Sequence, residues 1–224
     1  MNDESEDTQP IRFTFYEKHQ WRQVLTVPGP DWQVGAVWDE AYRLGAKRLI
    51  EGVARGEYSE DFEGVAGLYL FRHYLELSIK FLIFHSRWLE DQHTNANAAA
   101  IQDVAKTHSL QGLWTMARAE CVRVMPAEEW NAIDIAFIDA CITEFHAIDP
   151  NGERFRYHGE RFGVEKDPAR ARKAAQTLTQ DLIVDYSQLS AALDHVYDIL
   201  NYLDVYMRET HGQNAEWARY LESL

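Results

Sequence analysis

The sequence has little cysteine, few basic residues and no long apolar run, and each shortage excludes a class of protein. Cys121 and Cys141 are too few for a disulfide framework, and their spacing is not that of a zinc ribbon. No run without a charged residue exceeds eleven residues, whereas a membrane helix needs roughly 18 or more. The first ten residues carry four acids and no base, the opposite of a secretory or transit peptide. We therefore expect a cytoplasmic protein that does not contact a membrane.

The shortage of basic residues also limits the partners. The chain has 22 Lys and Arg against 36 Asp and Glu, a formal net charge of −14. Such a chain repels nucleic acid on average. The charge is uneven, however, because residues 152–173 hold seven basic and four acidic residues. An anionic ligand is expected to meet the protein there.

What the chain has in quantity is apolar sequence with helical spacing. Hydrophobic residues make up 46% of it and aromatic residues 12%, which suffices for a buried core. Residues 60–90 are apolar nearly all round and contain no proline, which predicts the central helix of a bundle. Further helices are predicted over residues 31–56, 110–124, 126–148 and 169–211 (with one break near 181–185), followed by a short last helix.

The sequence therefore predicts an all-α protein with one helical domain over residues 11–224. Residues 1–10 are expected to form a disordered acidic tail. The domain is expected to begin with a short extended arm over residues 11–27, and to contain an irregular loop over residues 149–158.

Charged residues interrupt the predicted central helix on one face. Arg72, Glu76 and Lys80 lie at i, i+4 and i+8, with His73 beside them. Burying such charges costs several kcal/mol per ion unless partners arrive from elsewhere. The stripe has two interpretations. In the structural one, it is a salt-bridge ladder or the solvated side of the helix. In the functional one, it is the wall of a site that faces the 149–158 loop.

That loop carries a second candidate group. Residues 149–152 (Asp-Pro-Asn-Gly) predict a break, and Arg154, Arg156 and His158 then alternate, so that in an extended segment they share one face. Two guanidinium groups beside an imidazole suit a phosphodiester, because Arg neutralises developing charge and His moves a proton. In the structural alternative, Arg156 forms a buried ion pair with Glu76 near Asp149.

Two other features have simpler interpretations. Thr107, His108 and Ser109 precede a predicted helix and are interpreted as its N-terminal cap. Residues 90–93 form one Glu-x-x-His, but a di-metal centre needs a second copy that is missing. We therefore predict no metal site and no cofactor.

Three segments together resemble HEPN-like proteins of prokaryotes: LYLFRHYLELSIKFLI (68–83), THSLQGLW (107–114) and FHAIDPNGERFRYH (145–158). The resemblance spans about residues 64–208. Many such proteins are uncharacterised, and several serve in toxin–antitoxin or phage-defence systems. The resemblance implies an antiparallel helical bundle that commonly forms a homodimer. In active members it also implies metal-independent RNA cleavage at a composite site between the subunits.

One departure from the family bears on catalysis. Active members carry Arg and then His four to six residues later, near the start of a late helix, whereas Arg156 and His158 stand closer together. Three hypotheses follow. The chain is a noncatalytic HEPN-like dimer with a partner protein of a defence or toxin–antitoxin system. Alternatively, it is a ribonuclease with Arg156 and His158 as catalytic residues and with an RNA-binding set made up of Arg154, Arg72, His73 and Lys80. The third hypothesis is a bundle that binds a small molecule or a metal.

Overall fold

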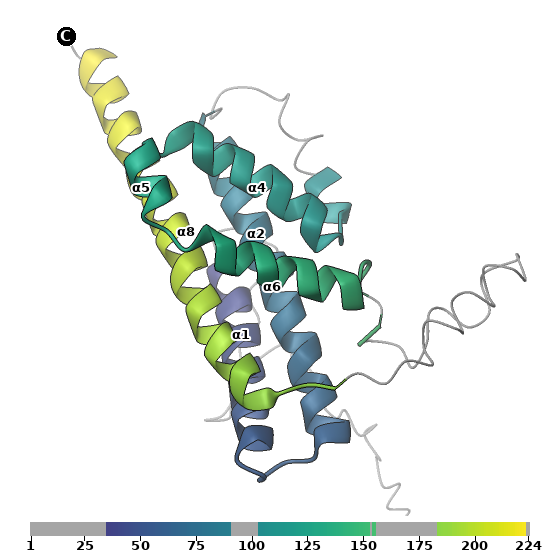
Figure 1. Cartoon of the computed structure of the whole chain (residues 1–224). Helices are drawn as coiled ribbons and strands as arrows, with labels where there is room; N and C mark the ends of the chain where they lie inside the picture. Colours follow the sequence, from purple (N-terminus) through teal and green to yellow (C-terminus); the bar gives the residue numbers. More distant parts are fainter. Residues whose placement is uncertain (1–34, 91–102, 153, 156–182, 223–224) are drawn as a thin grey trace, which may run out of the picture. The chain divides into compact units, whose positions relative to one another are not determined.

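The computed structural model describes residues 35–90, 103–152, 154–155 and 183–222. Within these ranges every regular element is a helix and none is a strand (Figure 1), so the all-α prediction is confirmed. The chain divides into two units, 1–34 and 35–224, and everything described below belongs to the second. The predicted acidic tail and extended arm lie outside the described residues.

The central helix of the bundle is α2 (Val65–Glu90), which follows a π-helical turn, η2 (Glu60–Gly64). The helix predicted over residues 60–90 is thus confirmed in its span. A short turn joins it to α1 (Gly35–Ala54), and the two helices lie side by side (Figure 1). The apolar residues of α2 explain its central position, because they are buried against α1, α4 and α8.

The middle of the chain forms three helices: α4 (Leu110–Val124), α5 (Ala127–Asn131) and α6 (Ile135–Ile148). Ser109 caps α4, since its side chain accepts a hydrogen bond from the N–H of Gly112 at 3.2 Å. The single helix predicted over residues 126–148 is wrong. Asp134 starts a new helix there, because its carboxylate accepts the N–H of Phe137 at 3.2 Å.

The last element is α8 (Tyr186–Glu222), a single helix of 37 residues. Asp185 caps it, accepting the N–H groups of Ser187 and Gln188 at 3.0 Å. The helix begins after the break predicted near 181–185, and the part of the prediction over residues 169–182 lies outside the described residues. The separate last helix is wrong, because α8 continues to Glu222. Its buried stripe packs on α1 and α2 and comprises Leu193, Val196, Ile199, Leu200, Leu203 and Met207. None of the described helices combines the length and the apolar character that crossing a membrane requires.

Candidate functional site

The charged stripe of α2 is buried and belongs to an ionic network of five residues. We call Arg72, Glu76, Lys80, His108 and Asp149 the buried ionic network. Arg72 and Glu76 are each 1% exposed, Asp149 is 2% exposed and Lys80 is 6% exposed. Charges at such depth are stable only when they are paired and hydrogen-bonded.

Glu76 is the centre of this network. Its Oε2 accepts a hydrogen bond from Nη1 of Arg72 at 2.8 Å, and its Oε1 accepts one from Nζ of Lys80 at 2.8 Å. Nδ1 of His108 also lies 2.8 Å from Oε1, and it must donate because a carboxylate only accepts. Burial by itself raises the pKa of Glu76, but the hydrogen bonds from Lys80 and Arg72 outweigh it and lower the pKa to about 2. The carboxylate is therefore ionised at neutral pH.

The two cations also reach beyond α2. Arg72 donates from Nη2 to the carbonyl of His108 at 2.6 Å, and its Nε lies 3.1 Å from a carboxylate oxygen of Asp149. Lys80 donates to the carbonyl of Ala105 at 3.0 Å. The network therefore ties α2 to the segment before α4 and to the turn after α6.

The turn after α6 closes over the guanidinium of Arg72. Gly152 has φ +74°, in the left-handed region that favours glycine. A Cβ at this position would lie 2.8 to 2.9 Å from three atoms of the guanidinium. Asp149 holds the turn as well, because its Oδ1 accepts the N–H of Arg154 at 3.1 Å. The turn therefore requires glycine for both its conformation and its close approach.

The structure brings some of the predicted site residues together and separates others. Arg72, Glu76, Lys80 and Asp149 meet in the buried ionic network. His73 instead packs between Tyr42 and Tyr69, with ring centroids 4.4 and 5.7 Å away.

The loop residues are described only in part. Nη1 of Arg154 donates to the carbonyl of Ile148 at 3.3 Å, and Arg156 and His158 lie outside the described residues. The cap predicted over Thr107, His108 and Ser109 is confirmed at Ser109, whereas the side chain of His108 binds Glu76 and takes no part in the cap.

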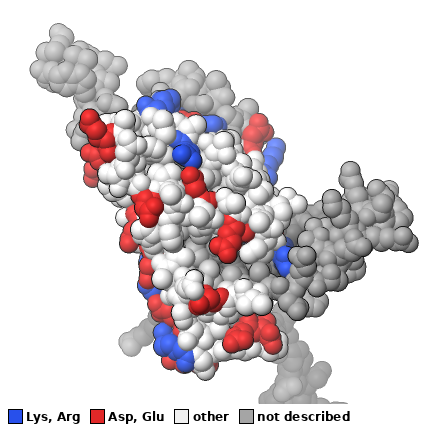
Figure 2. Space-filling model, viewed as in Figure 1, with Lys and Arg blue, Asp and Glu red and all other residues white. Residues whose placement is uncertain are grey.

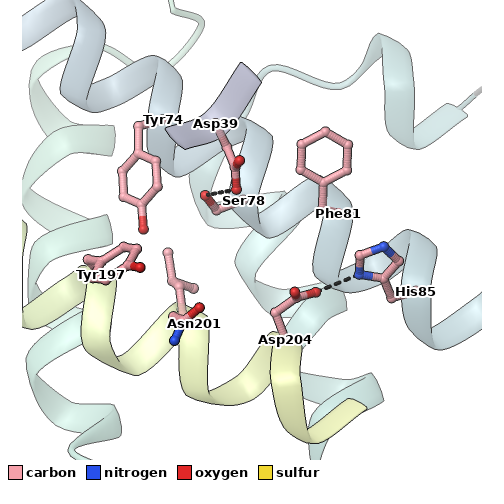
Figure 3. A pocket seen from close by; sticks show the side chains of 9 residues that line it. Asp39, Tyr74, Ser78, Phe81, His85, Tyr197, Asn201 and Asp204 are labelled. Atoms are coloured by element: carbon pink, nitrogen blue, oxygen red, sulfur yellow. Dashed lines mark hydrogen bonds and ion pairs between the residues drawn. The ribbon is translucent and has the colours of Figure 1, made fainter. Parts of the chain in front are cut away.

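A second group of polar side chains lines a small pocket that the sequence analysis did not predict. We call it the α1–α2–α8 pocket after the helices that form it, and its volume is about 50 Å³. Its lining comprises Asp39 of α1, Tyr74, Ser78, Phe81 and His85 of α2, and Tyr197, Leu200, Asn201 and Asp204 of α8 (Figure 3). Tyr74 and Leu200 are buried, and Asn201 is exposed.

Two acids of the pocket have different surroundings. Asp204 is paired, since one oxygen lies 2.5 Å from Nδ1 of His85 and the other 2.9 Å from Nε of Arg208. Asp39 accepts the N–H of Glu40 at 2.7 Å and the hydroxyl of Ser78 at 3.4 Å. Burial is the main cause that raises the pKa of Asp39 to about 6, and the negative charge of Asp204 contributes to this rise.

A sequence signal for this pocket exists in the spacing of its residues. Tyr74, Ser78, Phe81 and His85 follow the helical pattern i, i+4, i+7, i+11, which places them on one face of α2. The same pattern recurs in α8 at Tyr197, Asn201, Asp204 and Arg208. Spacing alone does not show that these two faces meet.

The comparisons with known proteins add no assignment. No protein-family model, curated protein or solved structure is significantly similar to this chain. Over the part of the chain that the structure describes, no three His, Cys, Asp or Glu side chains come together in a way that could hold a metal ion. The chemistry of the two polar groups must therefore be argued from their geometry.

Proposed function

We propose that this protein is a noncatalytic, cytoplasmic HEPN-like module: an antiparallel helical bundle that forms a homodimer and engages a partner protein of a prokaryotic defence or toxin–antitoxin system. The observation that carries the proposal is the burial of the ionic stripe of α2. Arg72 and Lys80 are 1% and 6% exposed and donate to Glu76 and to backbone carbonyls. Cations used in this way hold the bundle together and do not reach a phosphate.

The charge of the surface supports the same proposal. On the face shown in Figure 2, acidic side chains are spread among neutral ones, and the described residues form no broad basic patch there. Together with the net charge of −14, this surface disfavours nonspecific RNA binding. A partner protein is therefore the preferred macromolecular ligand.

Exposed apolar side chains near the η2 turn support association with a second copy. Phe62 is 77% exposed, and Tyr58 and Val65 are 46% and 41% exposed. Neighbouring exposed apolar residues are typical of protein interfaces. Light scattering on the purified protein should give twice the chain mass of 26.0 kDa, and Phe62→Ser should shift the mass toward the monomer. A monomeric wild-type protein would contradict the dimer.

The noncatalytic assignment is tested by incubating the purified chain with tRNA in EDTA. We expect intact RNA over a range of protein concentrations. Cleavage that disappears in Arg156→Ala and His158→Ala variants would overturn the assignment and establish a metal-independent ribonuclease in its place.

One observation favours this ribonuclease as the second candidate function. His108 holds its Nδ1 against buried Glu76 while 48% of its side chain is exposed, so a carboxylate orients an imidazole that solvent can reach. Arg72 donates to the backbone carbonyl of His108 and pairs with Asp149, so one guanidinium links the His108 backbone to the turn that precedes Arg156 and His158 in the sequence. An oriented imidazole is the usual form of a general base.

The two candidates are distinguished by a pair of histidine variants. His195 is a matched control, because it is 44% exposed and its Nε2 lies 3.2 Å from Asp134. If the protein cleaves RNA through the His108 region, His108→Ala should abolish cleavage and His195→Ala should leave it unchanged. If His108→Ala cleaves RNA as fast as His195→Ala does, His108 takes no part in the reaction.

A further inference from the structure

The α1–α2–α8 pocket contains an acid whose charge no neighbouring cation balances. Among the described residues, the carboxylate of Asp39 accepts only the N–H of Glu40 and the hydroxyl of Ser78. The two charged groups that act on it electrostatically, Asp204 and Glu40, are acids as well. The one nearby cation on its own helix, Arg43, is bound to both carboxylate oxygens of Glu40, at 2.7 and 2.6 Å.

The rest of the lining is suited to a positive charge with a carbon skeleton. Tyr74, Phe81 and Tyr197 present aromatic rings around Asp39 (Figure 3), and a cation gains energy on the face of such a ring. The ring of Tyr197 already binds one cation in this way, because the guanidinium carbon of Arg43 lies 4.0 Å from its centroid.

The size of the pocket limits the ligand. A volume of about 50 Å³ exceeds the roughly 10–15 Å³ that one water needs, but it holds only a few heavy atoms. Tyr74 and Leu200 form the buried floor and Asn201 is exposed at the rim, so the head of a ligand enters while its tail stays outside. A metal ion fits less well, because the described part of the chain offers no group of three suitable ligands.

We propose that the α1–α2–α8 pocket binds the alkylammonium head of a small amine, with the carboxylate of Asp39 as its counter-ion and the rings of Tyr74, Phe81 and Tyr197 around its methyl or methylene groups. The raised pKa of Asp39 agrees with this, since a half-buried carboxylate without a counter-ion resists ionisation and a bound cation would relieve that cost. The proposal stands apart from the HEPN-like function, because it uses no residue of the buried ionic network.

The test is an NMR titration of the isotope-labelled chain with a series of cations: methylammonium, trimethylammonium and choline. The matched neutral probe is 3,3-dimethylbutan-1-ol, which has the shape of choline without its charge. We expect saturable shifts of amides in α1, α2 and α8 around the pocket with at least one cation, and none with the neutral probe. Absence of saturable shifts with all three cations at millimolar concentrations, or equal shifts with the neutral probe, would overturn the proposal.

A pair of variants assigns the binding to Asp39. Asp39→Asn keeps the size and the hydrogen-bond acceptor but removes the charge, and it should weaken binding of the cation about tenfold. Glu51→Gln removes a surface charge from the same helix and should leave the affinity within about twofold. Both variants are first checked for native helix content and cooperative unfolding. Equal affinities of the folded Asp39→Asn variant and the wild type would show that the carboxylate is not the counter-ion.

Discussion

Replacing Glu76 by Gln should remove a large part of the stability of the fold. The substituted amide would keep the shape of the side chain, but it would leave the guanidinium of Arg72 and the ammonium of Lys80 buried without the charge that both contact at 2.8 Å. The N–H₂ of this amide would also face one of these donors. Breaking a buried ion pair costs about 3–5 kcal/mol, whereas the whole free energy of unfolding of a typical domain is roughly 5–15 kcal/mol. Urea unfolding followed by circular dichroism measures the loss.

The same experiment has a control on the surface of α1. Glu51 lies 3.7 Å from Lys47 and 3.6 Å from Arg55, and these exposed pairs contribute little, so that Glu51→Gln should cost less than about 0.5 kcal/mol. In addition, Lys80→Met should cost less in the Glu76→Gln background than in the wild type, because its partner is already gone. A loss below about 0.5 kcal/mol for Glu76→Gln would refute the reasoning from buried pairing.

Three further predictions concern stability. Gly152→Ala should lower the free energy of unfolding by about 2–3 kcal/mol, because the new Cβ would meet the guanidinium of Arg72 at 2.8 to 2.9 Å in addition to the strain at φ +74°. Gly56→Ala is the control: at φ +70° with nothing within 4 Å, it should lower the free energy of unfolding by only about 1 kcal/mol. Equal losses of the two variants in urea unfolding would contradict the close approach at Gly152. Asp39→Asn should stabilise the protein at pH 7 and have almost no effect near pH 3, because the pKa of Asp39 is raised from 3.8 to about 6 and ionisation of this carboxyl costs stability as the pH rises through that window. The full shift corresponds to about 3 kcal/mol, and we expect about 1 kcal/mol because solvent screens this half-buried group; a destabilised variant at pH 7 would contradict this. Glu76 has the opposite pH dependence, because its pKa is lowered from 4.5 to about 2. Up to about 3 kcal/mol of stability should therefore be lost as the pH falls from about 4.5 to about 2. A Glu76→Gln protein that keeps the full acid-dependent loss would exclude this carboxylate as the source of that loss.

The helical fold could be predicted from apolar periodicity, but two helix boundaries could not. Between Pro126 and Ile148 the apolar spacing fits one helix, and only the side-chain cap made by Asp134 shows that a second helix starts there. An aspartate can cap a helix or lie on its solvated face, and local sequence does not distinguish these roles. At the C-terminus, Gly212 and Asn214 disfavour a helix, yet α8 continues through them.

The buried ionic network was predictable in part. The spacing of Arg72, Glu76 and Lys80 places them on one face, and their apolar surroundings predict that partners are needed. The sequence suggested arginines of the 149–158 loop as partners of Glu76, whereas the described contacts of Glu76 come from its own helix and from His108. Backbone carbonyls such as that of Ala105 also take part, and no sequence pattern reveals them.

The α1–α2–α8 pocket was missed because neither of its helical faces stands out alone. A row of Tyr, Ser, Phe and His on α2 resembles an ordinary helix surface, and so does the row on α8. The pocket arises only when the buried stripe of α8, including Leu200, packs against α2 and brings Asp204 to His85. Tertiary packing, which periodicity does not specify, therefore determines this site.

The ionic stripe of α2 is an internal, paired network, and the titration of Glu76 tests this most directly. Carbon-13 NMR of the side-chain carboxyl, assigned by comparison with Glu76→Gln, reports the protonation of this one group as the pH is lowered. The network predicts that Glu76 stays ionised to a pKa of about 2. Titration near the ordinary glutamate value of about 4.3 would show that the carboxylate lacks its buried partners, and would contradict the account.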